Sequence, residues 1–541
     1  MKDISSTGSF VDFTLENFIY VDKTVYIPQL VKLKRVFISR PRRFGKSLTL
    51  DTIATLFETG VEPYFKGTWI YDKWTEPTYP VLRLNFLNFD KNTLEKFNNK
   101  LNSKITEFAE LNQVTTYKEK EEAEDSIDHL LEQLRLEGRQ IVILIDEYDC
   151  QMTANINNET LYKQFQEKIK SFYANIKDKF AIKFLGITGV TRLKDVSIFS
   201  VGSDINDITN ASAYSQMIGF TRDEIKKYYI DYLKQASSYE NNCSVDDVTD
   251  TQLESMLDMM AQNYDGYCFD EDYEKKVFST WSVNKFFQTM IEKKKVQFGE
   301  YWYDNGGLPS ILVNYLKTHE LNIFEYLDKD KFLKVSSDDF KNPTALTTIN
   351  QNVLMCQTGY LTLRSDLNKT STVALGIPNG EIYKALNRLL ANNIFKGNTD
   401  ITDDYGRSLL EVGTVDDIIN LFNSALNSVS YDNYPIVSES SVQNMLKLYL
   451  LGAHQEVLSE VHEAKGRADL VVNTDNRRIV FEFKYAKNEA EAKSKLSEAV
   501  EQIKTRDYGN ILPKKNELIR IAAVFNADPK VRAFTENQIV P

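Results

Sequence analysis

The sequence predicts an α/β protein in three parts: a parallel β-sheet covered by helices, a mostly helical middle region, and a smaller C-terminal α/β domain. The chain has 541 residues, which at roughly 150 residues per domain corresponds to three or four folded units. Hydrophobic residues make up 42% and charged residues 26% of the chain, a balance typical of packed globular domains rather than of disordered chains. The division into three parts depends on changes in the spacing of apolar residues along the chain.

The first 200 residues alternate short apolar runs with amphipathic stretches, which is the pattern of parallel strands joined by helices. Strands are expected over 35–39, 80–85, 140–145 and 183–188. A helix is expected over 48–57, directly after the first strand and a short loop. These elements are assigned to a first domain, 1–220.

After this domain the apolar spacing lengthens to that of helices. Helices are expected over 224–235, 251–263 and 283–294, with a single strand over 359–363. We interpret this middle region, 221–405, as a helical lid.

The last part of the chain, 406–541, is expected to form a separate domain with its own sheet. Its expected helices cover 440–451 and 489–506, and its expected strands cover 456–462, 468–473, 478–484 and 517–525. These elements follow one another as a helix, three strands, a helix and a last strand.

Composition excludes several classes of protein. The apolar runs are far shorter than the roughly 20 residues that a membrane-spanning helix needs, and the N-terminal residues lack the basic and apolar parts of a secretory signal. A cytoplasmic location without membrane contact is therefore expected. The four cysteines lie far apart without a C-x-x-C pair, which argues against a disulfide scaffold and against a cysteine zinc site.

The net charge of −12 excludes a wholly cationic surface, so any contact with nucleic acid must come from a local patch. One such patch lies between Val31 and Leu50, where no acid interrupts the basic residues Lys32, Lys34, Arg35, Arg40, Arg42, Arg43 and Lys46.

The stretch from Val36 to Ser47 runs from an apolar strand through a tight loop into a helix, which is the form of a phosphate-binding P-loop. In such a loop the backbone N–H groups surround phosphate oxygens, a lysine neutralises them and a hydroxyl holds Mg²⁺. Gly45, Lys46 and Ser47 match these roles. The remaining loop residues expected to contact a nucleotide are Arg42, Arg43 and Phe44. The first glycine of the usual G-x-x-x-x-G-K-[ST] pattern would fall on Arg40, so a basic turn before a helix is the alternative.

A second element favours nucleotide binding. The strand over 140–145 ends in adjacent acids, and charge at the C-terminal edge of a parallel sheet lies where ligands bind. Asp146 is expected to hold Mg²⁺ through water, and Glu147 to orient or deprotonate the attacking water. Thr188 ends the next strand, where a polar side chain would sense the γ-phosphate of ATP. Arg192 follows it as a candidate arginine finger, with an ordinary surface arginine as the alternative.

Near the C-terminus, Asp469 is followed after twelve residues by Glu482-x-Lys484. Alternate residues of a strand share a face, so Glu482 and Lys484 are expected to point together. Two carboxylates provide oxygen ligands for Mg²⁺ or Mn²⁺, and a lysine beside them positions the attacking water or stabilises charge on phosphate. This is the arrangement of metal-dependent phosphodiester cleavage. The alternative is an exposed strand edge on which Glu and Lys form an ordinary pair.

Together these motifs resemble a bacterial family that joins an AAA-ATPase-like domain to a C-terminal PD-(D/E)XK nuclease domain, and the resemblance covers nearly the whole chain. The similar stretches are Phe18–Thr24, Arg40–Ser47, Ile145–Asp149, Thr188–Val190, Asp204–Thr209, Tyr264–Tyr267, Gln357–Leu361, the residues Asp469, Glu482 and Lys484, and Gln502-Ile503 with Tyr508. In this family the loop normally reads Arg-Pro-Arg-Arg-Phe-Gly-Lys-Ser, so Arg40 is expected. The resemblance implies an AAA-like P-loop NTPase sheet, a helical lid and a restriction-endonuclease-like α/β domain.

The leading hypothesis is an ATP-binding and ATP-hydrolysing protein coupled to a metal-dependent nuclease, with DNA favoured over RNA and the number of subunits left open. One alternative is a nucleotide-controlled switch or scaffold whose C-terminal domain binds nucleic acid without cutting it. Another is a plain NTPase with a structural tail, because acids outnumber bases between Ile401 and Pro541. A role in defence against phages or mobile elements follows only by analogy.

Overall fold

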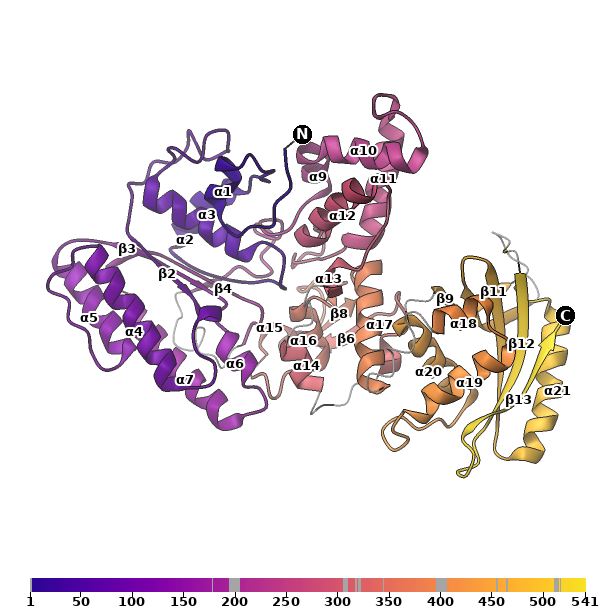
Figure 1. Ribbon diagram of the computed structural model, residues 1–541. Helices are drawn as coiled ribbons and strands as arrows, with labels where there is room; N and C mark the ends of the chain where they lie inside the picture. The colour runs from indigo at the N-terminus through magenta and orange to yellow at the C-terminus, as the bar shows by residue number, and fades with distance from the viewer. Residues whose placement is uncertain are drawn as a thin grey trace. The chain divides into compact units, whose positions relative to one another are not determined.

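In the computed structural model the chain forms two compact units (Figure 1). The first contains Met1–Leu321 and Phe332–Ile382, and the second contains Asn322–Lys331 and Tyr383–Pro541. The structure describes residues 2–177, 179–193, 205–304, 310–316, 319, 323–343, 345–395, 406–453, 456–463, 466–509, 515 and 517–541. Asp204, which the resemblance includes, lies outside these ranges. The division at residues 220 and 405 stays a prediction.

A five-stranded parallel sheet in the order β2-β3-β4-β1-β5 forms the centre of the first unit. Its strands are β1 (Arg35–Ser39), β2 (Val81–Asn85), β3 (Ile141–Asp146), β4 (Ile182–Gly189) and β5 (Asn206–Asp207). Every residue of β3 is buried, because helices cover both faces of a parallel sheet and leave no polar face. The four expected strands are confirmed, and the short edge strand β5 was missed.

Helices cover this sheet on both sides, with α1, α2 and α3 on one side and α4, α5 and α7 on the other (Figure 1). Their bounds are α1 (Phe10–Leu15), α2 (Ile27–Leu33), α3 (Lys46–Thr59), α4 (Leu94–Leu111), α5 (Ala123–Leu136), α6 (Cys150–Ala154) and α7 (Glu159–Ile176). The pattern of α5 is typical: Ile127, Leu130, Leu131 and Leu134 recur at helical spacing and are all buried.

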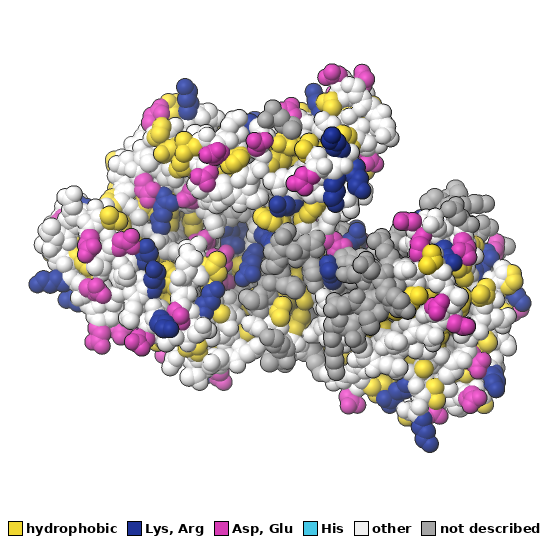
Figure 2. Space-filling view, in the orientation of Figure 1, with side chains coloured by type: hydrophobic (Ala, Val, Ile, Leu, Met, Phe, Trp, Pro, Cys, Tyr) yellow, Lys and Arg dark blue, Asp and Glu magenta, His cyan; other side chains and the backbone are white. Residues whose placement is uncertain are grey.

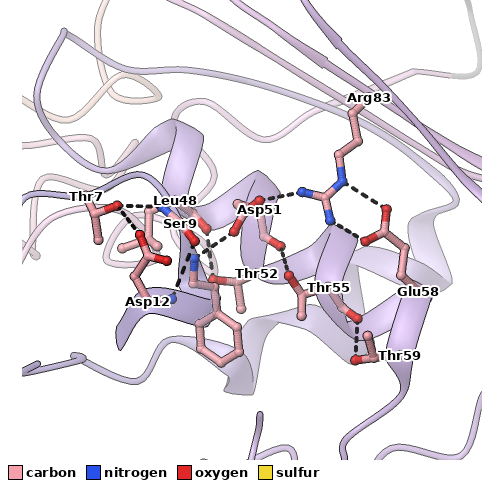
Figure 3. A network of polar contacts seen from close by, with 11 residues as sticks. Thr7, Ser9, Asp12, Leu48, Asp51, Thr52, Thr55, Glu58, Thr59 and Arg83 are labelled. Atoms are coloured by element: carbon pink, nitrogen blue, oxygen red, sulfur yellow. Dashed lines mark hydrogen bonds and ion pairs between the residues drawn. The ribbon is translucent and has the colours of Figure 1, made fainter. Parts of the chain in front are cut away.

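A polar network holds the N-terminal helix against α3 and β2 (Figure 3). The backbone N–H of Phe10 donates to Oδ2 of Asp51 at 2.7 Å. The other carboxylate oxygen of Asp51 pairs with Arg83 of β2. Arg83 also pairs with Glu58, which lies closer to the C-terminal end of α3. Asp51 thereby joins three segments around the helix that begins at the predicted P-loop.

The remainder of the first unit is mainly helical but also contains a small sheet in the order β6-β8-β7. Its helices are α9 (Arg222–Tyr228), α10 (Ile230–Asn241), α11 (Asp250–Tyr264), α12 (Thr280–Lys293), α13 (Tyr301–Asp304), α14 (Ser310–Leu316), α15 (Ser337–Lys341) and α16 (Gln351–Thr358). Its strands are β6 (Leu333–Ser336), β7 (Thr362–Leu363) and β8 (Thr372–Gly376). The helix expected over 224–235 is two helices that divide at Tyr229, and the expected single strand is part of this sheet.

The second unit contains a mixed sheet in the order β13-β12-β11-β10-β9, in which only β11 and β12 run parallel. Its strands are β9 (Glu456–Glu463), β10 (Gly466–Asn473), β11 (Arg477–Ala486), β12 (Glu517–Asn526) and β13 (Ala533–Val540). Helix α17 (Gly380–Ile394) runs from the first unit into the second, followed by α18 (Arg407–Val412), α19 (Val415–Asn427), α20 (Glu439–Gly452) and α21 (Glu489–Arg506). Helix α21 is the crossover between the parallel strands, and its Ile503 packs with Val471 and Val480 in the core.

The expected strands and both expected helices of this unit are confirmed. Strand β13 and helices α17, α18 and α19 were missed. Among the described residues, no helix combines the length and the apolar character that crossing a membrane requires.

Candidate functional site

The loop between β1 and α3 places Lys46 at the first residue of the helix. Gly45 precedes it with a φ of 104°, in the left-handed region that glycine adopts without strain. The Nζ atom of Lys46 donates to the carbonyl oxygens of Arg40 at 3.1 Å and Pro41 at 3.2 Å. With only 4% of the residue exposed, its ammonium lies inside the loop, where phosphate oxygens bind in a P-loop.

Asp146, at the end of β3, accepts hydrogen bonds from the polar groups at this edge of the sheet. Its Oδ2 atom accepts a hydrogen bond from Oγ of Ser47 at 2.6 Å, and its Oδ1 atom accepts from Oγ1 of Thr188. The backbone N–H of Glu147 also donates to Oδ1, at 3.0 Å. The three predicted residues Ser47, Asp146 and Thr188 are thus brought together at the carboxyl ends of adjacent parallel strands. A hydroxyl beside a carboxylate is a donor set that suits Mg²⁺.

Glu147 turns sharply after the strand, with a φ of 53° that side-chain-bearing residues rarely adopt. Its Oε1 atom lies 3.7 Å from Nζ of Lys46. Burial raises the pKa of the Glu147 carboxyl above its ordinary value, and the positive charge of Lys46 opposes that rise. A carboxylate with a raised pKa is a stronger base, which suits a group that takes a proton from water.

The sequence reasoning overlooked Asp149, the last acid of the same motif. Its buried carboxylate accepts hydrogen bonds from the backbone N–H and the hydroxyl of Thr191, at 2.7 and 2.6 Å. A Cβ atom on Gly189 would lie 2.4 Å from the ring of Tyr148 and 2.8 Å from Asp149. Asp149 therefore fixes the segment after β4 against the end of β3. The sequence feature that could have indicated this role is the position of Asp149 two residues after Glu147, in the same acidic motif.

Two of the predicted nucleotide-binding residues have structural contacts. The Arg43 guanidinium donates to the carbonyl oxygens of Tyr301 at 3.0 Å and Trp302 at 2.9 Å. The Phe44 ring is 1% exposed and packs edge-on against Tyr267, with 4.7 Å between ring centroids. These side chains fix the loop to residues more than 200 positions away in the sequence, which no local motif could indicate.

Arg40 is also a structural residue. It is 1% exposed, and its guanidinium donates to the carbonyl oxygens of Ser39 at 2.9 Å and Thr209 at 2.6 Å. The guanidinium carbon lies 4.2 Å from the centroid of the Phe269 ring. Burial lowers the pKa of Arg40 to about 9. An arginine in place of the usual glycine thus connects the end of β1 to the segment around Thr209.

Arg192 forms an ion pair with Asp207 at the end of β5. Its backbone N–H donates to Oε1 of Gln357 at 3.2 Å, and its carbonyl accepts from Nε2 of the same side chain, also at 3.2 Å. The side chain therefore has a partner within its own unit, and its role as an arginine finger stays a prediction.

A cavity of about 530 Å³ adjoins the loop. Its polar wall includes Arg42, Lys46, Ser47 and Glu147, and its apolar wall includes Phe13, Ile19, Ile27, Met217 and Ile218. A cavity with cations at one side and apolar side chains at the other suits a nucleotide, whose phosphates are charged and whose base is flat and apolar.

The second site lies in the C-terminal sheet. Strands β10 and β11 pair antiparallel, with Leu470 opposite Phe481, and this register brings Asp469 beside Glu482. Glu439, the first residue of α20, joins them, so that oxygen atoms of Glu439, Asp469 and Glu482 lie within 4.8 Å of one another. The sequence predicted Asp469 and Glu482 but missed Glu439, because its placement depends on how α20 packs against the sheet.

Lys484 lies among these acids. Its Nζ atom is 2.9 Å from Oε1 of Glu482 and 3.2 Å from Oε1 of Glu439. Burial opposes the charge of Lys484, but the two neighbouring carboxylates raise its pKa above the ordinary value. Lys484 therefore stays protonated and acts as a fixed positive charge at this site.

The carboxylates themselves fit a divalent cation. Oε2 of Glu482 is buried and has no hydrogen-bond partner in the part of the chain that the structure describes. Burial, and next the charge of Asp469, raise the pKa of Glu482 to about 7, and burial also raises the pKa of Asp469. The backbone N–H of Phe483 donates to Oδ2 of Asp469 at 2.9 Å and fixes that side chain. A cation would satisfy the orphaned oxygen and offset the crowded negative charge.

The helix after this site supplies further polar groups. Nε2 of Gln502 donates to the Tyr508 hydroxyl at 3.4 Å, and the Arg506 guanidinium donates to the same oxygen at 2.8 Å. The Tyr508 ring is fully buried in the core of the sheet. Gln502 and Tyr508, which the family resemblance names together, are thus in contact.

Two family models match the parts of the chain that contain these sites. Residues 5–199 match a family model described as "Predicted AAA-ATPase", and residues 437–535 match one described as "PD-(D/E)XK nuclease superfamily". The "Uncharacterized protein in vnfD 5'region" of Azotobacter chroococcum mcd 1 is 26% identical over 533 residues, covering 95% of this chain and 94% of that protein. The crystal structure of Cdc6p from Pyrobaculum aerophilum aligns at 10% identity and a TM-score of 0.22, covering 68% of this chain and 91% of the other. A TM-score this low does not establish a shared fold.

The loop site lies within the first matched range, apart from the contacts that its loop makes with later residues of the same unit. The carboxylate site, including Glu439, lies within the second.

Proposed function

Because the chain joins an AAA-ATPase-like domain to a PD-(D/E)XK nuclease superfamily domain, we propose that it hydrolyses ATP in the first and cleaves nucleic-acid phosphodiester bonds with a divalent metal in the second. The observation that carries the nuclease half is the convergence of Glu439, Asp469 and Glu482 within 4.8 Å, with the Lys484 ammonium 2.9 Å from Glu482. An exposed strand edge with an ordinary ion pair would not bury Glu482 or leave its second oxygen without a partner.

In the ATPase half, the backbone N–H groups of the loop and the Lys46 ammonium bind the phosphates. Ser47 and Asp146 would hold Mg²⁺, which supplies charge neutralisation at the phosphates when it is bound. Glu147, with its raised pKa, takes the proton of the attacking water. The Thr188 hydroxyl donates a hydrogen bond to Asp146 and so orients its carboxylate.

In the nuclease half, Glu439, Asp469 and Glu482 would hold the cation, Mg²⁺ or Mn²⁺, which lowers the pKa of bound water and polarises the phosphate when it is bound. Lys484 stabilises the negative charge that develops on the phosphate, because its raised pKa keeps it protonated. The backbone N–H of Phe483 keeps Asp469 in position throughout.

A plasmid-nicking assay on the full chain tests this function. We expect cleavage with Mg²⁺ or Mn²⁺, no cleavage in a chelator, and loss of cleavage in Lys484→Ala. The matched control is Lys487→Ala, an exposed lysine just beyond the end of β11. Cleavage of no DNA or RNA substrate under any metal condition would overturn the nuclease proposal and favour a domain that binds without cutting.

The proposal also covers the substrate, the location and the assembly. DNA is proposed as the substrate in preference to RNA, the location as cytoplasmic, and an assembly of several copies is left open. A role in defence against phages or mobile elements is proposed by analogy alone.

A further inference from the structure

A second cavity in the first unit, of about 690 Å³, lies at the edge of the parallel sheet opposite the P-loop. Arg35, Gln140 and Ile182, which begin or precede strands β1, β3 and β4, line it. Lys46 and Asp146 lie at the other ends of the same strands. Because β1 has five residues at about 3.3 Å each, the two edges are roughly 17 Å apart. A ligand at this second edge therefore does not occupy the nucleotide site.

Cations dominate the lining of this cavity. Among the residues that the structure describes, the lining contains a single carboxylate, Glu76, and the lining cations are Lys32, Lys34, Arg35, Lys73, Lys179 and Lys183. On the face drawn in Figure 2, by contrast, Lys and Arg side chains are interspersed with Asp and Glu side chains. For a chain with a net charge of −12, this cavity is a local concentration of positive charge.

Part of this charge is already paired. Lys183 pairs with Glu76 at 2.6 Å, Lys73 pairs with Asp72 at 2.8 Å, and Lys179 pairs with Asp128. Lys32 and Lys34 are exposed and form no ion pair with any residue that the structure describes. These two ammonium groups are available to an anion that enters from solvent.

The backbone at Lys34 is strained. Its φ is 64°, in the region that favours glycine, although a lysine side chain stands there. Its carbonyl accepts the backbone N–H of Leu185 at 2.9 Å, and its own N–H donates to Val31 at 3.1 Å. Hydrogen bonds to Val31 of α2 and Leu185 of β4 thus hold Lys34 in this conformation, and Lys32 and Lys34 both line the cavity.

An aromatic ring stands among these cations. Phe180 is 66% exposed and lines the cavity, while Nε2 of Gln140 donates to its carbonyl at 2.8 Å and fixes its backbone. Cationic side chains that follow a phosphate backbone, together with an exposed ring on which a base can stack, are how proteins bind single-stranded nucleic acid. In a duplex the bases are already stacked and paired, so an exposed ring gains little from them.

We propose that this basic cavity binds single-stranded nucleic acid, with Lys32 and Lys34 contacting phosphates and Phe180 stacking on a base. This inference rests on the proposed function in one respect only, namely that the bound polyanion is a nucleic acid. The C-terminal part of the chain gives this site a purpose, because acids outnumber bases between Ile401 and Pro541, so this part has no net positive charge to attract a polyanionic substrate.

The test measures binding by the full chain in a chelator, so that nothing is cut. A fluorescein-labelled single-stranded DNA, an RNA of the same sequence and the corresponding duplex DNA are titrated by fluorescence anisotropy at several salt concentrations. We expect Lys32→Glu combined with Lys34→Glu to raise the Kd for single strands at least about tenfold, and to reduce the slope of log Kd against log salt by about 1 to 2. The two single-stranded probes separate DNA from RNA.

Phe180→Ala is expected to weaken single-strand binding about tenfold and to leave both duplex binding and the salt slope unchanged, since it removes stacking rather than charge. Lys100→Glu, an exposed lysine on α4, is the matched charge-reversal control and is expected to change neither quantity. Melting temperature and ATP affinity verify that each variant is folded, and Lys32→Gln combined with Lys34→Gln replaces the reversal if that variant does not fold.

A double variant with the Kd and salt slope of Lys100→Glu would overturn the inference. Equal loss of duplex and single-strand affinity, with no effect of Phe180→Ala, would overturn its preference for single strands. Failure of the proposed nuclease is a separate result, because loss of cleavage does not change binding in a chelator.

Discussion

The Nζ atom of Lys46 lies 3.7 Å from Oε1 of Glu147, so the cation of the P-loop faces the acid that follows β3. Both groups are largely buried, at 4% and 18% side-chain exposure. Phosphate oxygens that enter the loop would compete with Glu147 for the same ammonium. Nucleotide binding is therefore expected to release the Glu147 carboxylate toward the attacking water.

Lys46→Ala tests the P-loop. The substitution removes a charge directed at the loop interior rather than an apolar core group, so we expect ATP affinity to fall by about a hundredfold or more while the chain remains folded. Calorimetric titration with ATP measures the affinity, and thermal unfolding measures the fold. Lys100→Ala on α4 is the control. Parental ATP affinity in Lys46→Ala would rule out the P-loop assignment.

Glu147→Gln separates nucleotide binding from hydrolysis. The amide keeps the size of the side chain but cannot accept a proton, so ATP is expected to bind while its turnover slows about 10²- to 10⁴-fold. Steady-state phosphate release measures the turnover. If the variant hydrolyses ATP at the parental rate, another group is the base.

The metal ligands of the second site are distinguished by Mn²⁺ titration of the full chain without nucleotide. Asp469→Asn and Glu439→Gln are each expected to weaken Mn²⁺ binding about tenfold or more, because each removes an oxygen charge within 4.8 Å of the others. Lys484→Ala is expected to retain Mn²⁺ and to lose cleavage, since its ammonium acts on phosphate rather than on the metal. Unchanged Mn²⁺ affinity in Glu439→Gln would remove Glu439 from the ligand set.

The buried carboxyl group of Glu381 is expected to make the free energy of unfolding depend on pH. Burial raises its pKa to about 8 from an ordinary value of 4.5, and its carboxylate accepts hydrogen bonds from Ser282 at 2.7 Å and from the backbone N–H of Trp302 at 2.8 Å. Between these pKa values the folded state holds a proton that the unfolded chain has lost. The free energy of unfolding should therefore fall as pH rises through this window, by about 1.4 kcal/mol per pH unit.

Glu381→Gln cannot ionise, so this part of the pH dependence should disappear. Urea unfolding midpoints at about pH 5 and about pH 7.5 measure the effect, and they are compared with those of the parent and of Glu110→Gln, a control at an exposed glutamate of α4. A parental pH dependence in Glu381→Gln would mean that the carboxyl is not protonated in the folded chain.

The sequence predicted residues whose proximity follows from strand geometry. Ser47, Asp146 and Thr188 meet because parallel strands end at one edge, and Asp469 meets Glu482 because their strands pair. Local patterns carry that information, since each strand is a single apolar run followed by its polar residues.

What the sequence could not predict depends on packing between distant segments. Glu439 reaches the carboxylates Asp469 and Glu482 only through the position of α20, and Arg43 contacts Tyr301 and Trp302 across the first unit. The strands β6 and β8 were also missed.

The second unit includes Asn322–Lys331, a segment that precedes the last part of the first unit in the chain, and Tyr383 donates to the carbonyl of Leu327 at 3.0 Å within it. A single cut in the chain cannot separate the two units, because each unit consists of two segments. A C-terminal fragment that starts at Tyr383 therefore lacks Asn322–Lys331 of its own unit, and an N-terminal fragment that ends at Ile382 carries this segment without the rest of that unit.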